Sequence, residues 1–124
     1  MSSTKDYAKY VTEDLMADID NVSARAMFGG YGMYKDGVIF GLIVENQLYF
    51  KIDETTMEKY KKAGSKPFEY EMRGKMSSMP YWLVPEEILD SPQDLQNWVE
   101  ESVEISIKAK EMKKTPKKKR DSLN

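Results

Sequence analysis

The stretch MFGGYGMYKDGVIF, residues 27–40, places three glycines within four positions and then runs directly into an apolar segment. A dinucleotide-binding fingerprint requires its glycine turn to open a helix, because the helix N-terminus supplies the amide donors for pyrophosphate. Here Asp36-Gly37 follows instead, a dipeptide typical of a two-residue hairpin turn, so strand, turn and strand are predicted. A Walker loop is excluded as well, since no Gly-Lys-Ser or Gly-Lys-Thr follows at its spacing. The paired glycines therefore favour a β-bulge or the close approach of another backbone.

Three strands are predicted around this turn, at about 24–34, 38–45 and 47–52. The middle one, VIFGLIV, is apolar at every position except its glycine, as expected for a strand that is covered on both faces. The third, LYFKI, alternates, and its apolar residues on one side are Leu48, Phe50 and Ile52. The short connections make the three strands an antiparallel meander.

Helices and two more strands are predicted on either side of this meander. Apolar residues spaced four apart predict an amphipathic helix over residues 5–20. The predicted order after the meander is a helix capped by Asp53 or Thr55 and ended by Gly64, a strand at 68–73, a loop at 74–80, a strand at 81–84, a short turn at 85–89 and a long helix from Pro92 to about Met112. The fold class is therefore α+β, with a five-stranded antiparallel sheet.

Composition limits both the domain organisation and the chemistry. The 124 residues suit one domain, predicted at residues 1–112, and the run after Thr115-Pro116 has no apolar pattern, so residues 113–124 are predicted to form a disordered basic tail. The chain has no cysteine and no histidine, which removes the usual zinc ligands, the commonest general base and every imidazole triad. No catalytic residue, cofactor or metal is expected, nor a signal peptide or membrane span, and a cytoplasmic location follows.

The net charge of −2 hides an asymmetry along the chain. Residues 1–107 hold 11 basic and 19 acidic side chains, whereas residues 108–124 hold 8 basic and 2 acidic ones. Because an acidic body repels phosphates, the tail is the expected place for any nucleic-acid contact, which would be weak.

These residues together resemble the TfoX N-terminal domain family of bacterial competence regulators, also called Sxy-like. The similarity covers SARAMFGGYGMYKDGVIFGLIVENQLYFKID at 23–53, GSKPFEYEMRGK at 64–75 and PYWLVPEEILDSPQDLQNWV at 80–99. Its signature residues are Arg25, Met27, Phe28, Gly29, Gly30 and Gly32. The resemblance implies helices packed on an antiparallel sheet, similar to the secretion-chaperone-like fold, and a role in regulation rather than catalysis. It also implies a stand-alone domain here, without the C-terminal domain of full-length members.

Charged and apolar side chains near the glycines are the candidate interaction residues. Arg25 and Lys51 lie within the meander, and either they snorkel over a solvated sheet face or they form an anion-binding or acidic-partner patch, which Arg73 and Lys75 would extend. Nine methionines and eight tyrosines favour a protein interface near the two hairpins. Tyr31 or Met33 is expected to contact a partner. The full candidate set is Arg25, Met27, Phe28, Gly29, Gly30, Tyr31, Gly32, Met33, Lys51, Arg73 and Lys75.

Two functions remain open at this point. The first is a non-enzymatic regulatory module that acts by protein association, with an unidentified partner or as a homodimer. The second is a nucleic-acid-associated accessory protein that uses the basic tail, and its binding would weaken steeply with salt.

Overall fold

The computed structural model describes residues 5–27 and 29–123, and the side chains within that range as far as Glu111. Its elements in chain order are α1 (Lys5–Tyr10), the π-helical η1 (Val11–Leu15), β1 (Val22–Met27), β2 (Gly30–Lys35), β3 (Val38–Val44), β4 (Gln47–Lys51), α2 (Met57–Lys62), β5 (Pro67–Met72), β6 (Lys75–Leu83), α3 (Glu86–Leu89) and α4 (Pro92–Leu123). The predicted α+β class is confirmed.

The described strands form one six-stranded sheet in the order β1-β2-β3-β4-β6-β5, and every neighbouring pair is antiparallel. The prediction of five strands was wrong. The single strand expected at 24–34 is two strands, because Gly29 has a φ of 78° and the chain reverses between β1 and β2. A strand needs negative φ angles, so a glycine in this conformation ends one strand before the next begins.

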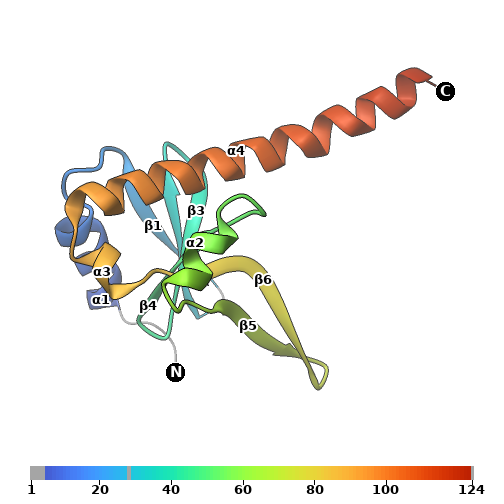
Figure 1. The fold of residues 1–124 in the computed structure, drawn as a ribbon. Helices are drawn as coiled ribbons and strands as arrows, with labels where there is room; N and C mark the ends of the chain where they lie inside the picture. The colour runs from blue at the N-terminus through green and yellow to red at the C-terminus, as the bar shows by residue number, and fades with distance from the viewer. Residues whose placement is uncertain (1–4, 28, 124) are drawn as a thin grey trace.

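Tight turns connect most of the other strands. The predicted Asp36-Gly37 and Glu45-Asn46 turns are confirmed, with both residues of each pair at positive φ. The predicted loop at 74–80 was wrong: Arg73-Gly74 is a third turn of this kind, and β6 begins directly after it at Lys75. β5 and β6 therefore form one long hairpin, which projects from the rest of the sheet (Figure 1).

A β-bulge in β3 places two apolar residues that are three positions apart, Phe40 and Ile43, on the same face of the sheet. The register of β3 against β2 shifts by one residue at Phe40. Phe40 and Ile43 are fully buried on one face, whereas Leu42 packs on the other. A Cβ on Gly41 would lie 2.5 Å from the Tyr49 carbonyl oxygen, so only glycine fits beside the bulge.

The main core lies between the helices and one face of the sheet, which we call the helix-covered face. Figure 1 shows α4 running across the sheet. Leu95 and Val99 of α4 are almost fully buried, and the partly buried Trp98 packs against Tyr60 of α2 with ring centroids 4.6 Å apart. The sheet contributes Met33, Phe40, Ile43, Leu48, Phe50 and Ile52 to this core.

The helix boundaries differ from the predicted ones at both ends of the chain. The first helix ends at Leu15 rather than residue 20, because Met16 leaves helical geometry with φ −108° and ψ 27°. Met16 and Ile19 are nevertheless buried, so the apolar spacing reports burial beyond the helix itself. The last helix starts at Pro92 as predicted but continues to Leu123, past the expected end at Met112. A separate disordered tail at 113–124 stays a prediction, since those side chains lie outside the described residues.

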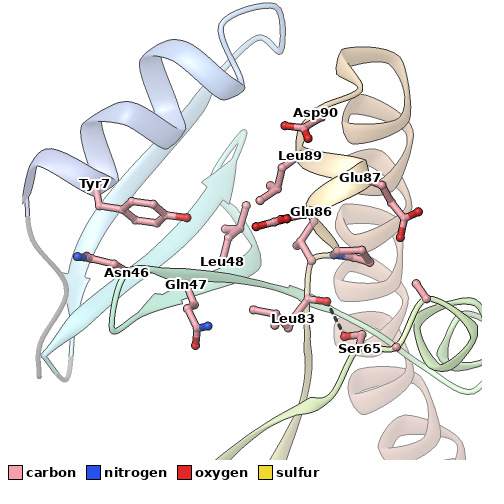
Figure 2. Close-up of a pocket in the computed structure, with 14 residues that line it drawn as sticks. Tyr7, Asn46, Gln47, Leu48, Ser65, Leu83, Glu86, Glu87, Leu89 and Asp90 are labelled. Atoms are coloured by element: carbon pink, nitrogen blue, oxygen red, sulfur yellow. Dashed lines mark hydrogen bonds between the residues drawn. The ribbon is translucent and has the colours of Figure 1, made fainter.

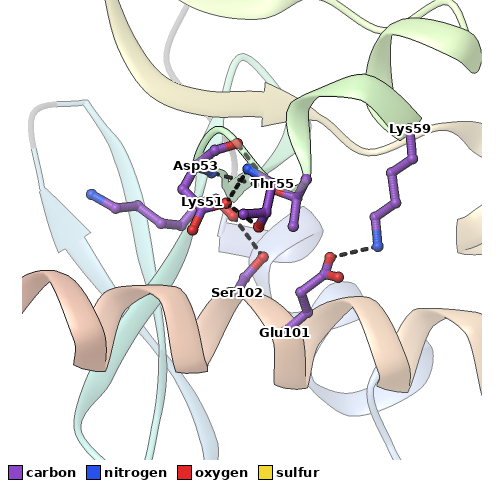
Figure 3. Close-up of polar contacts among 7 residues, drawn as sticks. Lys51, Asp53, Thr55, Lys59, Glu101 and Ser102 are labelled. Carbon is purple, nitrogen blue, oxygen red and sulfur yellow. Dashed lines mark hydrogen bonds and ion pairs between the residues drawn. The ribbon is translucent and has the colours of Figure 1, made fainter.

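Polar contacts hold α2 and α4 against the end of β4 (Figure 3). The fully buried Ser102 hydroxyl donates to the Lys51 carbonyl oxygen at 2.8 Å, and Lys59 forms an ion pair with Glu101. The turn before α2 is held by Asp53, whose carboxylate accepts from the Thr55 amide at 2.9 Å and the Thr55 hydroxyl at 2.6 Å. The prediction that Asp53 or Thr55 caps this helix was wrong: α2 begins at Met57, its N-cap is Thr56 without a side-chain cap hydrogen bond, and Asp53 holds the preceding turn instead.

Gly30 is expected to be far more sensitive to a methyl group than its neighbour on the same strand. A Cβ at Gly30 would collide with the Ile43 carbonyl oxygen of β3, which confirms the predicted close approach of another backbone. Gly30→Ala should lower the free energy of unfolding by about 2 kcal/mol or more, whereas Gly32→Ala, which meets the flexible Met27 side chain, should cost about 1 kcal/mol or less. Urea unfolding measures both. Equal losses would contradict the close approach.

Asp53 should stabilise the fold in a pH-dependent manner. Hydrogen bonds from the Thr55 side chain and backbone hold the pKa of Asp53 below its usual range. Because the folded pKa is lower than the unfolded one, the stabilisation is present above about pH 4 and is lost as the pH falls through the folded pKa. Asp53→Ala should therefore cost roughly 0.5–1 kcal/mol at pH 7, a small value since the carboxylate is largely solvated.

The matched control for Asp53 is Glu54→Ala, which removes the neighbouring, exposed carboxylate. Thermal unfolding of both variants at pH 7 and pH 2.5 compares the two effects. If Asp53→Ala destabilised the domain equally at both pH values, the loss would come from packing and not from the hydrogen bonds that the ionised Asp53 carboxylate accepts.

Candidate interaction surface

The sheet has a second apolar face that is built from strand residues. Tyr49, Tyr81 and Leu42 are at most 8% exposed there, and other side chains pack around them. Within the described residues, every member of this cluster comes from a strand, whereas the main core draws on all the helices. We call this the open face, defined by Met27, Ile39, Leu42, Val44, Tyr49, Phe68, Tyr81 and Leu83.

Two cations lie over aromatic rings at this face. The Arg25 guanidinium lies 4.9 Å from the centre of the Tyr34 ring, and the Lys51 ammonium lies 5.2 Å from the centre of the Tyr81 ring. These are cation–π distances, and the stems of both side chains cover apolar surface. Burial raises the pKa of the Tyr81 phenol, as it does for Tyr49, so both are neutral hydrogen-bond donors near pH 7.

The β5–β6 hairpin extends the open face away from the body of the domain. Phe68 lies edge-on to Tyr49 at 5.3 Å and stacks with Tyr70 at 6.1 Å. The register places Met72 and Met79 on the same side of the hairpin as Phe68. Met72 is 55% exposed and Met79 is 38% exposed, and Met76, on the opposite side, is 66% exposed. Flexible, apolar side chains therefore line the projecting hairpin on both sides.

A pocket beside α3, lined also by the start of β4 and the end of β6, contains several carboxylates (Figure 2). Its volume is about 770 Å³, and α3 contributes three carboxylates, Glu86, Glu87 and Asp90. Ser65 bridges two of its walls by donating to the Leu83 carbonyl oxygen at 2.6 Å. Among the described residues there is no group of three or more His, Cys, Asp or Glu side chains that could hold a metal ion.

The family can be assigned from a match over most of the fold. The family described as the TfoX N-terminal domain matches residues 14–106, a range that runs from η1 through the sheet to α4. The chain belongs to the TfoX N-terminal domain family.

Two known proteins are similar to this TfoX N-terminal domain. The DNA transformation protein TfoX1 of Aliivibrio fischeri is 26% identical over 96 residues, which cover 77% of this chain and 46% of that protein. Protein Sxy of Escherichia coli is 21% identical over 115 residues, which cover 93% of this chain and 55% of that protein. The chain thus spans about half the length of these relatives. None of the described helices is long and apolar enough to cross a membrane.

The structure separates the predicted site residues of this TfoX N-terminal domain into groups. Arg25, Met27 and Lys51 lie on the open face, and a Cβ on Gly32 would point toward the Met27 sulfur there. Gly29 and Gly30 serve the turn and the close strand approach described above. Phe28 lies outside the described residues.

The remaining predicted residues lie elsewhere. Met33 is fully buried in the main core, so its predicted partner contact was wrong: β2 alternates, and Met33 points to the helix-covered face. Tyr31 is half-buried against the same core, and its partner contact stays a prediction. Arg73 and Lys75 are exposed at the tip of the β5–β6 hairpin, which is separated from β1 by three intervening strands, so they do not extend a patch around Arg25. Anion binding by these residues stays a prediction.

Sequence reasoning missed the aromatic residues that connect the open face to the β5–β6 hairpin. Tyr49, Phe68 and Tyr70 were placed on strands, and the alternation of β5 indicated one apolar face. The position of β6 between β4 and β5 joins that face to Tyr49, and this pairing is non-local. No short-range pattern in the sequence specifies it.

Two methionines provide a direct test of the assignment of core and surface. Met33→Ala should lower the free energy of unfolding by about 2–4 kcal/mol because it leaves a cavity in the main core. Met79→Ala removes the same atoms from a partly exposed hairpin position and should cost about 1 kcal/mol or less. Urea unfolding of both variants measures the difference. A reversed order would overturn the assignment of the two faces.

Proposed function

We propose that this chain is a non-enzymatic regulatory module that acts by binding a protein partner through the open face and the β5–β6 hairpin. The observation that carries this proposal is the exposure of Met72, Met76 and Met79 on a hairpin that projects from the domain (Figure 1). Exposed apolar side chains gathered on one element are uncommon on monomeric surfaces and are typical of interaction sites.

The chemistry of this surface favours a protein partner with apolar side chains flanked by acidic ones. Methionine adapts its shape to an incoming surface, and aromatic residues such as Phe68 and Tyr70 supply large contact areas. Arg25 and Lys51 lie beside the apolar cluster, where they can pair with carboxylates at the rim of an interface. β5 is also an edge strand of the sheet, which leaves one row of its backbone groups for an added strand.

A regulatory rather than catalytic role is supported by the family and by composition. One similar protein is named for DNA transformation. The chain has no histidine or cysteine, and the carboxylates of its largest pocket lie beside no lysine, arginine or metal site among the lining residues. A general acid or base needs an orienting partner and a nucleophile or substrate position near it.

Removing the exposed methionines should abolish partner binding without unfolding the domain. The double variant Met72→Ser/Met79→Ser changes two exposed hairpin residues on the open-face side, so its melting temperature should stay close to that of the wild type. Affinity capture from native lysate, with the retained proteins identified by mass spectrometry, should recover a defined partner with the wild type and much less of it with the variant. Analytical ultracentrifugation of the purified chain tests whether a second copy is that partner.

Ile107→Ser is the matched control. The exposed fraction of Ile107, 39%, is similar to that of Met79, but Ile107 lies on α4 and not on the hairpin. It should retain the partner. Equal recovery by the wild type and the double variant would refute a role for the hairpin. A partner that is released by nuclease treatment would favour the nucleic-acid-associated function instead.

A further inference from the structure

A smaller pocket lies between the β2–β3 hairpin and α4, and the charge of its lining residues differs from that of the other pockets. Its volume is about 330 Å³, and its lining residues are Tyr34, Gly37, Val38, Ile39, Lys51, Ser106, Ala109 and Lys110. We call it the Lys51–Lys110 pocket. Residues of the β2–β3 hairpin and Lys51 form one wall, and one turn of α4, with Ser106 buried and Ala109 and Lys110 exposed, forms the other.

The lining of the Lys51–Lys110 pocket contains two lysines and no carboxylate. The other three pockets described here all include acidic residues: Glu86, Glu87 and Asp90 in the largest, Asp53, Glu100, Glu101 and Glu104 in the second, and Glu13 in the third. In a chain with 21 acidic and 19 basic residues, a pocket whose described charged lining residues are all basic differs from the average charge of the protein. Two ammonium groups beside one pocket create a positive potential that attracts anions.

A buried hydroxyl in the same pocket has no hydrogen-bond partner. Ser106 is 9% exposed, and its Oγ has no hydrogen-bond partner among the residues that the structure describes. A buried polar atom without a partner costs free energy, and native proteins rarely keep one without a function or a bound group. Ser102, one turn earlier on α4, shows the contrast, because its hydroxyl donates to the Lys51 carbonyl oxygen.

We propose that the Lys51–Lys110 pocket binds the phosphate group of an organic phosphate ester. The two ammonium groups would balance the charge of the phosphate, and the Ser106 hydroxyl would donate to one of its oxygens. Val38, Ile39 and Ala109 supply an apolar wall for the organic part of the ligand. The volume is near the lower end of the range for small-molecule sites, which suits a compact ester. This site is separate from the methionine hairpin of the proposed function.

Titration followed by amide NMR tests the site with three probes at constant ionic strength: inorganic phosphate, AMP, and a short single-stranded oligonucleotide without a terminal phosphate. Saturable shifts are expected at Val38, Ser106 and Ala109. Stronger binding of AMP than of the oligonucleotide would identify a small phosphate ester as the source of the phosphate group. The reverse order would identify a nucleic-acid backbone as the source and would overturn the ester proposal.

Three variants and a control connect the shifts to the pocket. Lys110→Gln and Lys51→Gln should each weaken AMP binding about tenfold, the size expected for one lost charge-assisted contact. Ser106→Ala should weaken binding as well, yet leave the melting temperature equal or higher because it removes an unpartnered buried hydroxyl. Lys108→Gln is the matched control, since Lys108 lies on α4 3.8 Å from Glu104 and lines a different pocket. Binding within twofold of the wild type is expected for it.

Two results would overturn the proposal. Equal losses in Lys108→Gln and Lys110→Gln would mean that the anion meets only the general positive charge of α4. Absence of shifts at Ser106 and Ala109 with all three probes at millimolar concentration would mean that the pocket holds no oxyanion. Neither result affects the hairpin test of the proposed function, because Met72 and Met79 lie outside this pocket.

Discussion

The β-bulge at Phe40 is the constraint that decides which side chains of β3 lie on each face of the sheet. A regular strand sends alternate side chains to opposite faces, so a strand as apolar as β3 has to bury both of its sides. The extra residue shifts the alternation, and Phe40 and Ile43 then fill the core under the helices while Leu42 packs on the open face. The bulge is possible because Gly41 carries no side chain where the Tyr49 carbonyl oxygen lies. The open face thus follows from backbone geometry in the centre of the sheet.

The local parts of this fold could be predicted from the sequence. The Asp36-Gly37 turn, the apolar side of β4 and the start of α4 at Pro92 each depend on a few neighbouring residues. The errors occurred where one feature had two local interpretations. Gly29-Gly30 is compatible with a bulge inside one strand or with a turn between two, and only the pairing of β1 with β2 decides. Residues 75–80 are polar enough for a loop, yet the Arg73-Gly74 turn pairs them with β5.

The candidate site was less predictable than the fold, for a physical reason. An apolar strand residue is equally consistent with the core and with an interaction surface until the position of the helices is known. Met33 and Met79 illustrate this, because both lie on strands and only Met79 is exposed. Arg25 and Lys51 lie over aromatic rings beside the open face, and their role as an anion-binding or acidic-partner patch stays a prediction. Arg73 and Lys75 could not be placed without the sheet order.

Lys51 belongs both to the open face of the proposed function and to the Lys51–Lys110 pocket of the phosphate proposal. Its carbonyl oxygen accepts the hydrogen bond from Ser102 and so helps to hold α4 on the sheet, while its ammonium lies over the Tyr81 ring on the open face. The same side chain lines the pocket beneath α4. A phosphate in that pocket would compete with the Tyr81 ring for the ammonium, and the charge beside the open face would fall as the pocket fills. Occupancy of the pocket should then weaken an acidic protein partner, and by reciprocity the partner should weaken phosphate binding by the same factor.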